Sequence, residues 1–213
     1  MSFIKNVIIR VNAFLTTITI EIHLTPDSIN LGNRTSYPYS IGQLVLYEAQ
    51  LDRPNAVRLL TPENASHDVS ISPSYRYMVD SYSTVSQEPV NVVRNRNGKV
   101  IMTLEKPDLQ PVYEMGWKAP ERFKVKAADG VTDLYGVMWK PADFDSTKVY
   151  PIISNVYPGP VFEYVPTRFT INDVYNTRLA QLGFIVITVG HRGCTPMRGM
   201  AVNTDFGDRK SVV

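Results

Sequence analysis

The sequence predicts a mixed fold, in which a β-rich first half is followed by an α/β second half. Short runs of β-branched and aromatic residues recur between Thr17 and Leu104, and turn-forming residues separate them, which is typical of antiparallel strands. A strand, a helix and a second strand are then predicted in succession within Pro151–Val189. The 213 residues, with 44% hydrophobic content, can form a core, but length alone does not separate one domain from two partial domains.

The first predicted strand is Thr17–Ile22, because it alternates strictly between isoleucine and polar residues, as a half-buried strand does. Pro26–Tyr39 is rich in Pro, Asn, Ser, Gly and Tyr, which is typical of a long connection. Further strands are expected at Gln43–Ala49, Val57–Leu60, Asp68–Ser72, Arg76–Tyr82, Val90–Arg94 and Lys99–Leu104. Short strands at even spacing suit the blades of a β-propeller.

Turn residues indicate two hairpins and a boundary between them. Asn97-Gly98 precedes the last of these strands, and Asn-Gly between β-rich runs is a strong hairpin signal. From Lys106 to Pro120, prolines lie among charged and aromatic residues without periodicity, which indicates a domain boundary. Asp129-Gly130 then favours a second hairpin between Phe123–Lys126 and Leu134–Lys140.

The last predicted elements form a parallel crossover. Pro151–Tyr157 is a short apolar run that a Pro-Gly-Pro turn ends, as in a buried strand. Asn172–Leu182 has apolar residues at helical spacing, with Asn172-Asp173 as its N-cap and Gly183 after it. Phe184–Val189 is continuously apolar, the pattern of a strand covered on both faces. Strand, helix and strand in this order imply a right-handed crossover.

Several motifs in these elements resemble one protein family. NVYPGP at Asn155–Pro160, TRLAQLGF at Thr177–Phe184 and VGHRG at Val189–Gly193 resemble the prolyl oligopeptidase family of serine peptidases, specifically its dipeptidyl peptidase IV branch. Upstream, HDVSISPSYRYMVDSYSTVSQEP resembles the last propeller blade of that branch, and FKVKAADGVTDLYGVMWKP resembles the hairpin that begins its α/β-hydrolase domain. The match runs from about Leu44 to Thr204, and the motifs occur in the family's order.

The resemblance implies partial β-propeller blades followed by the truncated beginning of an α/β-hydrolase domain. Residues 1–106 would be the C-terminal part of the propeller, 107–120 a linker and 121–207 the start of the peptidase domain. Residues 208–213 are interpreted as a non-native tail, because DRKSVV resembles the translation of a sequencing-library adapter. No secretory signal follows Met1, so we expect Met1 to be an internal start; an exported or periplasmic location is implied only by resemblance to bacterial members.

The implied activity is that of a serine exopeptidase, which releases Xaa-Pro or Xaa-Ala dipeptides from peptide substrates through an acyl-enzyme and uses no cofactor. The chain contains no G-x-S-x-G motif, and the resemblance would have the triad Ser, Asp and His follow later, so we expect it to be inactive by itself. One catalytic element remains: Tyr157 matches the tyrosine whose hydroxyl donates to the oxyanion. A neutral phenol can donate a directed hydrogen bond to developing negative charge. Without the family context, packing under the adjacent turn would be the more ordinary role.

Other chemistries find little support in the sequence. The net charge of +2, from 22 basic and 20 acidic residues, provides no basic stripe for nucleic acid. His191 and Cys194 are neighbours, but no third group orients them, so a Cys–His nucleophile is not favoured, and Arg192 is assigned an ion pair or a loop contact. His23 and His67 have no second ligand at metal spacing, so we predict no metal site.

Two alternatives remain at this point. A noncatalytic β-rich binding protein would explain the missing triad, and an acylaminoacyl peptidase or prolyl endopeptidase would share the start of the hydrolase domain. For the intact protein, the resemblance also allows a homodimer. Ending the sheet after Phe184–Val189 is expected to leave that apolar strand unpaired, so the chain by itself should aggregate or dimerise.

Overall fold

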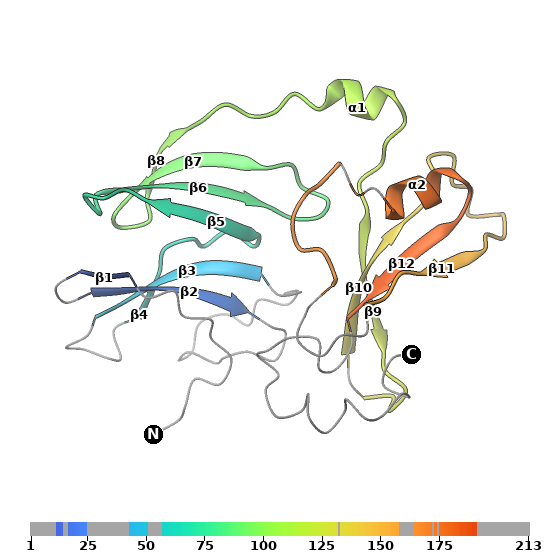
Figure 1. The fold of residues 1–213 in the computed structure, drawn as a ribbon, viewed down its shortest axis with the longest axis horizontal. Helices are drawn as coiled ribbons and strands as arrows, with labels where there is room; N and C mark the ends of the chain where they lie inside the picture. The colour runs from blue at the N-terminus through green and yellow to red at the C-terminus, as the bar shows by residue number, and fades with distance from the viewer. Residues whose placement is uncertain are drawn as a thin grey trace. The chain divides into compact units, whose positions relative to one another are not determined.

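The computed structural model describes residues 12–14, 17–24, 43–50, 57–131, 133–157, 164–171, 173 and 175–190. The chain divides into two compact units, which are described separately below (Figure 1). The first unit comprises Met1–Thr84 and Glu88–Pro107, and the second comprises Val85–Gln87 and Asp108–Val213. The described residues are mostly β-sheet with few helices, which agrees with the β-rich class predicted from the sequence.

The described residues of the first unit form two four-stranded antiparallel sheets. One sheet has the order β1-β2-β3-β4, with bounds Asn12–Phe14, Thr17–Leu24, Gln43–Gln50 and Val57–Leu59. The other has the order β5-β6-β7-β8, with bounds Ser66–Ile71, Tyr77–Ser83, Val90–Asn95 and Val100–Thr103. Strand β1 was not predicted, and the other strands lie close to their predicted positions. Four-stranded antiparallel sheets of this kind are what propeller blades contain.

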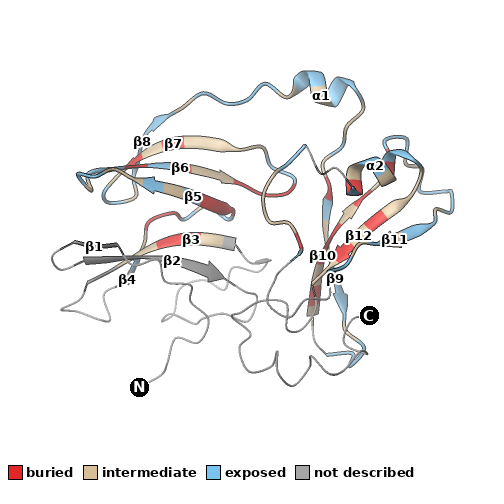
Figure 2. Ribbon diagram, in the orientation of Figure 1, coloured by how far each residue is buried: buried red, intermediate tan, exposed pale blue. Residues whose placement is uncertain are grey.

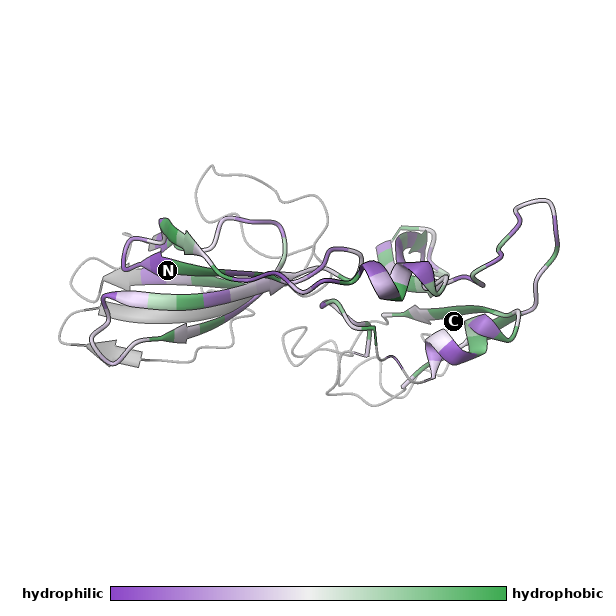
Figure 3. Cartoon of the chain, turned by 90° about the horizontal axis from the view of Figure 1, so that it is seen from above, coloured by the Kyte–Doolittle hydropathy of each residue, from purple (hydrophilic) through white to green (hydrophobic). Residues whose placement is uncertain are grey.

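The core of this unit lies where β3 of one sheet meets β5 and β6 of the other. Leu46 on β3, Leu60 after β4 and Met78 on β6 are buried together, and Val69 and Ile71 of β5 pack against them. Buried positions alternate along β6 and β7, as expected of strands with one face toward a core (Figure 2). Hydrophobic residues concentrate on the strands of the molecule, whereas the helices carry many hydrophilic ones (Figure 3).

The hairpin between β7 and β8 contains the predicted Asn-Gly turn. The N–H of Gly98 donates to the carbonyl oxygen of Asn95 at 2.9 Å, and the N–H of Asn95 donates to the carbonyl of Lys99 at 2.9 Å. Gly98 has φ of +81°, a conformation that residues with a Cβ rarely adopt. A Cβ at Gly98 would also lie 2.5 Å from the carbonyl oxygen of Leu60. The turn therefore needs glycine for two independent reasons.

Gly98→Ala is expected to lower the free energy of unfolding by about 1–3 kcal/mol from backbone strain, and the contact with Leu60 adds to that loss. The matched control is Gly130→Ala, because Gly130 has φ of +69° but nothing within 4 Å of its Cβ position. Urea denaturation of the two variants would measure the difference. Equal losses in both would contradict the role of the Leu60 contact.

The second unit contains one mixed four-stranded sheet of order β11-β12-β10-β9. Its strands are β9 (Glu121–Lys126), β10 (Asp133–Trp139), β11 (Ile152–Ser154) and β12 (Ile185–Val189). β9 and β10 form the second predicted hairpin, and β11 and β12 are parallel, as the predicted crossover requires. The helices are α1 (Gln110–Glu114), within the predicted linker, and α2 (Asn176–Gln181), which packs on β12 and β10. Neither described helix is long and apolar enough to cross a membrane.

The position of β12 corrects one expectation. Phe184–Val189 was expected to be left unpaired, but β12 pairs with β11 on one side and with β10 on the other. The described edge next to it is β11, where the side chain of Ile152 is 63% exposed. Strand β12 follows β11 in the chain but lies between β11 and the β9–β10 hairpin in the sheet. This apolar strand therefore has a neighbour on each side. Aggregation of the chain stays a prediction, and its apolar edge would be β11.

Helix α2 is shorter than the predicted Asn172–Leu182, and the predicted N-cap at Asn172-Asp173 is wrong, because the N-cap is Tyr175, whose side chain makes no capping hydrogen bond. Asp173 lies two residues before that N-cap, and its Oδ1 accepts from the N–H of Asn176, the first helical residue, at 3.2 Å. The predicted signal at the C-terminal end is present. After the helix, the N–H groups of Gly183 and Phe184 donate to the carbonyl oxygens of Ala180 and Leu179 at 3.0 and 3.3 Å. This is the Schellman pattern, and the φ of +96° at Gly183 permits it.

Candidate functional site

Tyr157, the predicted catalytic residue, lies just beyond the carboxyl end of β11. The strand pairing continues to Asn155, whose N–H donates to the carbonyl oxygen of Ile187 on β12 at 2.8 Å. Tyr157 is 52% exposed, and its ring stacks on the ring of Tyr164, with centroids 6.0 Å apart and planes inclined by 30°. The tyrosine thus lies at an accessible sheet edge, where its hydroxyl could meet a bound substrate.

A chain of amide and carboxylate groups connects this strand end to helix α2. The Asn155 Nδ2 group donates to Asn176 Oδ1 at 2.6 Å, and Asn176 Nδ2 donates to Asp173 Oδ2 at 2.9 Å. Asn155 Nδ2 also lies 3.5 Å from the hydroxyl of Tyr164, a long contact. Asn176 is buried at 5% exposure, so its paired amide holds the strand end against the helix from inside the unit.

The structure describes only some of the other residues for which the sequence suggested a role. His191, Arg192 and Cys194 lie outside the described residues, as do Pro158-Gly159-Pro160 and the tail at 208–213. The side chain of His23 is likewise not described. His67 lies inside β5, which begins at Ser66, and so it does not precede the strand as predicted. Its side chain lies among charged groups, those of Asp80, Arg94 and Glu63.

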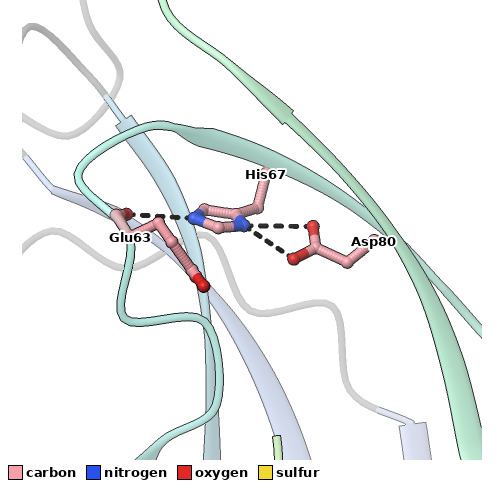
Figure 4. A group of neighbouring side chains, drawn as sticks. All are labelled: Glu63, His67 and Asp80. Carbon is pink, nitrogen blue, oxygen red and sulfur yellow. Dashed lines mark hydrogen bonds and ion pairs between the residues drawn. The ribbon is translucent and has the colours of Figure 1, made fainter. Parts of the chain in front are cut away.

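His67 lies in a largely buried cluster with Asp80, Arg94 and the half-buried Glu63. Figure 4 shows His67 between Glu63 and Asp80. His67 Nδ1 lies 3.0 Å from both carboxylate oxygens of Asp80 on β6, and Nε2 lies 3.0 Å from the backbone carbonyl oxygen of Glu63. Arg94 on β7 donates from Nε to Asp80 Oδ2 at 2.8 Å, from Nη2 to Glu63 Oε2 at 2.7 Å and from Nη1 to the carbonyl of Gly98 at 3.0 Å. The side chains of His67, Asp80 and Arg94 are at most 1% exposed.

The contacts of the cluster pair polar groups of opposite kinds. Both ring nitrogens of His67 lie within hydrogen-bond distance of oxygen atoms, one of the Asp80 carboxylate and one of the Glu63 backbone carbonyl. Burial alone would lower the pKa of Arg94, but its hydrogen bonds to Glu63 and Asp80 prevail and raise it. Burial, followed by the charge of Glu63, raises the pKa of Tyr82, whose ring centroid lies 5.1 Å from that of His67. The guanidinium of Arg94 thus faces two carboxylates.

Glu63, His67 and Asp80 also offer three donor atoms within 4.8 Å of one another, a set that could be considered for a metal ion. Both ring nitrogens of His67 already have partners, and the guanidinium of Arg94 binds both carboxylates. A metal ion would have to displace Arg94 from the carboxylates and a ring nitrogen of His67 from its present partner. The arrangement therefore favours a buried ion-pair network over a metal centre.

The cluster was not predicted from the sequence, because its members are far apart along the chain. His67 and Asp80 are 13 residues apart, and antiparallel register brings β5 against β6. The alternation of the strands does give one indication. Asp80 lies on the same buried face of β6 as Met78, and Arg94 lies on the same buried face of β7 as Val92. Opposite charges at inward positions of adjacent strands indicate a buried ion pair.

Comparison with known proteins yields named relatives. No protein-family model matches the chain. Dipeptidyl-aminopeptidase B of Aspergillus oryzae is 31% identical over 188 residues, which cover 84% of this chain and 20% of the relative. Dipeptidyl peptidase 8 of Mus musculus is 26% identical over 164 residues, covering 70% of this chain and 17% of the relative. The chain spans about a fifth of the length of these curated relatives.

A solved structure agrees with the same assignment at the level of fold. A dipeptidyl aminopeptidase IV from Bacteroides ovatus superposes with a TM-score of 0.65 and 24% identity, over 88% of this chain and 24% of that one. The names of the relatives and this fold match the family that the sequence motifs indicated. The chain is therefore a relative of the dipeptidyl peptidase IV-like members of the prolyl oligopeptidase family.

Proposed function

We propose that this chain is part of a serine exopeptidase that releases Xaa-Pro or Xaa-Ala dipeptides from the N-termini of peptides through an acyl-enzyme. The observation that carries the proposal is the 31% identity with dipeptidyl-aminopeptidase B over 84% of the chain. The chain spans a fifth of that relative, so the activity would belong to a larger protein. The peptide substrate is its proposed partner, and a homodimer of the intact protein is a further part of the proposal.

The proposed domain arrangement has a propeller end at 1–106, a linker at 107–120, a hydrolase start at 121–207 and a non-native tail at 208–213. Its support comes from the two antiparallel sheets of the first unit, from the division after Pro107, and from the mixed sheet of the second. The outer face of β5–β8 also supports it, because the exposed side chains of Tyr77, Val79 and Met102 suit packing against another blade.

Within this proposal, the hydroxyl of Tyr157 would donate a hydrogen bond to the oxyanion of the tetrahedral intermediate. Its place beyond the carboxyl end of β11 supports that role, since catalytic groups of α/β proteins gather at this edge. The serine nucleophile needs a G-x-S-x-G turn, which the 213 residues do not contain. The chain alone is therefore expected to hydrolyse no peptide.

The test is to read the source DNA through both ends of the reading frame, to express the complete frame, and to assay Gly-Pro-p-nitroanilide together with fluorophosphonate labelling. Hydrolysis that requires a free amino terminus, with labelling of one serine, is expected. Cleavage of an N-acetyl-alanyl substrate or of an N-blocked prolyl substrate would instead assign one of the two related peptidases. A complete frame that neither labels nor hydrolyses would overturn the proposal in favour of a binding protein.

A further inference from the structure

Tyr164 is the aromatic neighbour of the proposed catalytic tyrosine. The ring centroids of Tyr157 and Tyr164 are 6.0 Å apart, and the planes are inclined by 30°. Such stacked aromatic pairs attract each other beyond the area that they bury. Tyr157 is 52% exposed and Tyr164 is 37% exposed, so both rings belong to the surface of the unit rather than to its core. The stack therefore forms at the place where a substrate would approach.

Tyr164 also has contacts other than the one with the Tyr157 ring. The next residue, Val165, is buried at 4% exposure and anchors the backbone at this point. The hydroxyl of Tyr164 lies 3.5 Å from Asn155 Nδ2, and Asn155 is bonded to Asn176. Tyr164 thus contacts both the strand end that carries Tyr157 and the Tyr157 ring itself, although six residues separate the two tyrosines in the chain.

We propose that Tyr164 is a positioning residue, which holds the phenol of Tyr157 in the rotamer that directs its hydroxyl toward the oxyanion. This inference rests on the proposed peptidase function. A half-exposed tyrosine has several staggered χ1 rotamers, and only one can direct the hydroxyl to a given point. Stacking involves the face of the Tyr157 ring and not its hydroxyl. It therefore restricts the rotamer of Tyr157 without using the O–H group as a hydrogen-bond donor. Preorganised donors of this kind are the ones that stabilise an oxyanion.

The test is a double-mutant cycle in the complete peptidase. Tyr164→Ala is expected to lower kcat about 10–100-fold with little change in KM, because a misdirected donor is lost mainly from the transition state. Tyr164→Phe keeps the ring and should stay within about twofold of the wild-type kcat. In a Tyr157→Phe background, Tyr164→Ala should have almost no further effect, because no hydroxyl is left to position. Tyr150→Ala removes a ring stacked on Phe144 in the same unit, and serves as the control with unchanged kcat.

A second measurement, made on the complete peptidase with selectively labelled tyrosines, does not depend on activity. Tyr164→Ala should shift the NMR ring resonances of Tyr157, and Tyr164→Phe should leave them nearly in place. Unshifted resonances in Tyr164→Ala, or kinetic losses that simply add in the cycle, would overturn the positioning role while leaving the peptidase assignment intact. Absence of hydrolysis by the complete protein, or a silent Tyr157→Phe, would overturn the proposed catalytic role and this inference with it.

Discussion

Asp80→Ala is expected to destabilise the first unit by about 3–5 kcal/mol, which is enough to unfold a marginally stable domain. Asp80 is fully buried and accepts from both His67 and Arg94. Its removal leaves the buried guanidinium of Arg94 with one remaining carboxylate, that of Glu63, and takes away the partner of His67 Nδ1. Removing one partner of a buried pair costs far more than the pair contributes, because the other charge stays desolvated. Urea denaturation followed by hydrogen exchange of β5–β7 amides would measure the loss.

Asp68→Ala is the matched control for Asp80→Ala, since Asp68 is an exposed aspartate on the neighbouring strand β5. Its effect is expected to stay within about 0.5 kcal/mol. A triple variant, His67→Phe with Asp80→Leu and Arg94→Met, separates charge from packing. If the loss comes from unpaired charge, the triple variant should recover much of the stability that Asp80→Ala removes. An Asp80→Ala loss below about 1 kcal/mol would contradict the ion-pair interpretation.

Tyr157→Phe is expected to lower kcat of the complete peptidase about 10²–10³-fold, the usual cost of losing one oxyanion donor. The substitution removes only the hydroxyl and keeps the ring that stacks on Tyr164, so KM and the melting temperature should change little. Steady-state hydrolysis of Gly-Pro-p-nitroanilide, together with a thermal melt, would measure both.

Tyr175→Phe is the control for this experiment, because Tyr175 is a 72% exposed tyrosine in the same unit. Its kcat should equal that of the unsubstituted protein. An unchanged kcat in Tyr157→Phe would remove Tyr157 from the catalytic machinery and would favour the packing role. A lower melting temperature of Tyr157→Phe, with an unchanged kcat per folded molecule, would also favour the packing role.

The strands could be predicted because local sequence carries their signals. Alternation marked β2, and Asn97-Gly98 marked the hairpin between β7 and β8. The helix α2 was predicted from its end signals, although its first turn begins later than the spacing suggested. The short helix α1 was missed, because five residues with a proline show no helical period.

The sequence by itself determined the class of each half, the two hairpins, the parallel crossover and the family resemblance, because each depends on residues close together in the chain. Three features were decided only by the tertiary structure. Strand β12 lies inside its sheet, and Tyr164 stacks on Tyr157. Asp80 is hydrogen-bonded to both His67 and Arg94. These contacts depend on strand order, register and chain reversal. A shift of one residue in register turns a side chain to the opposite face, so no local pattern can specify its partner.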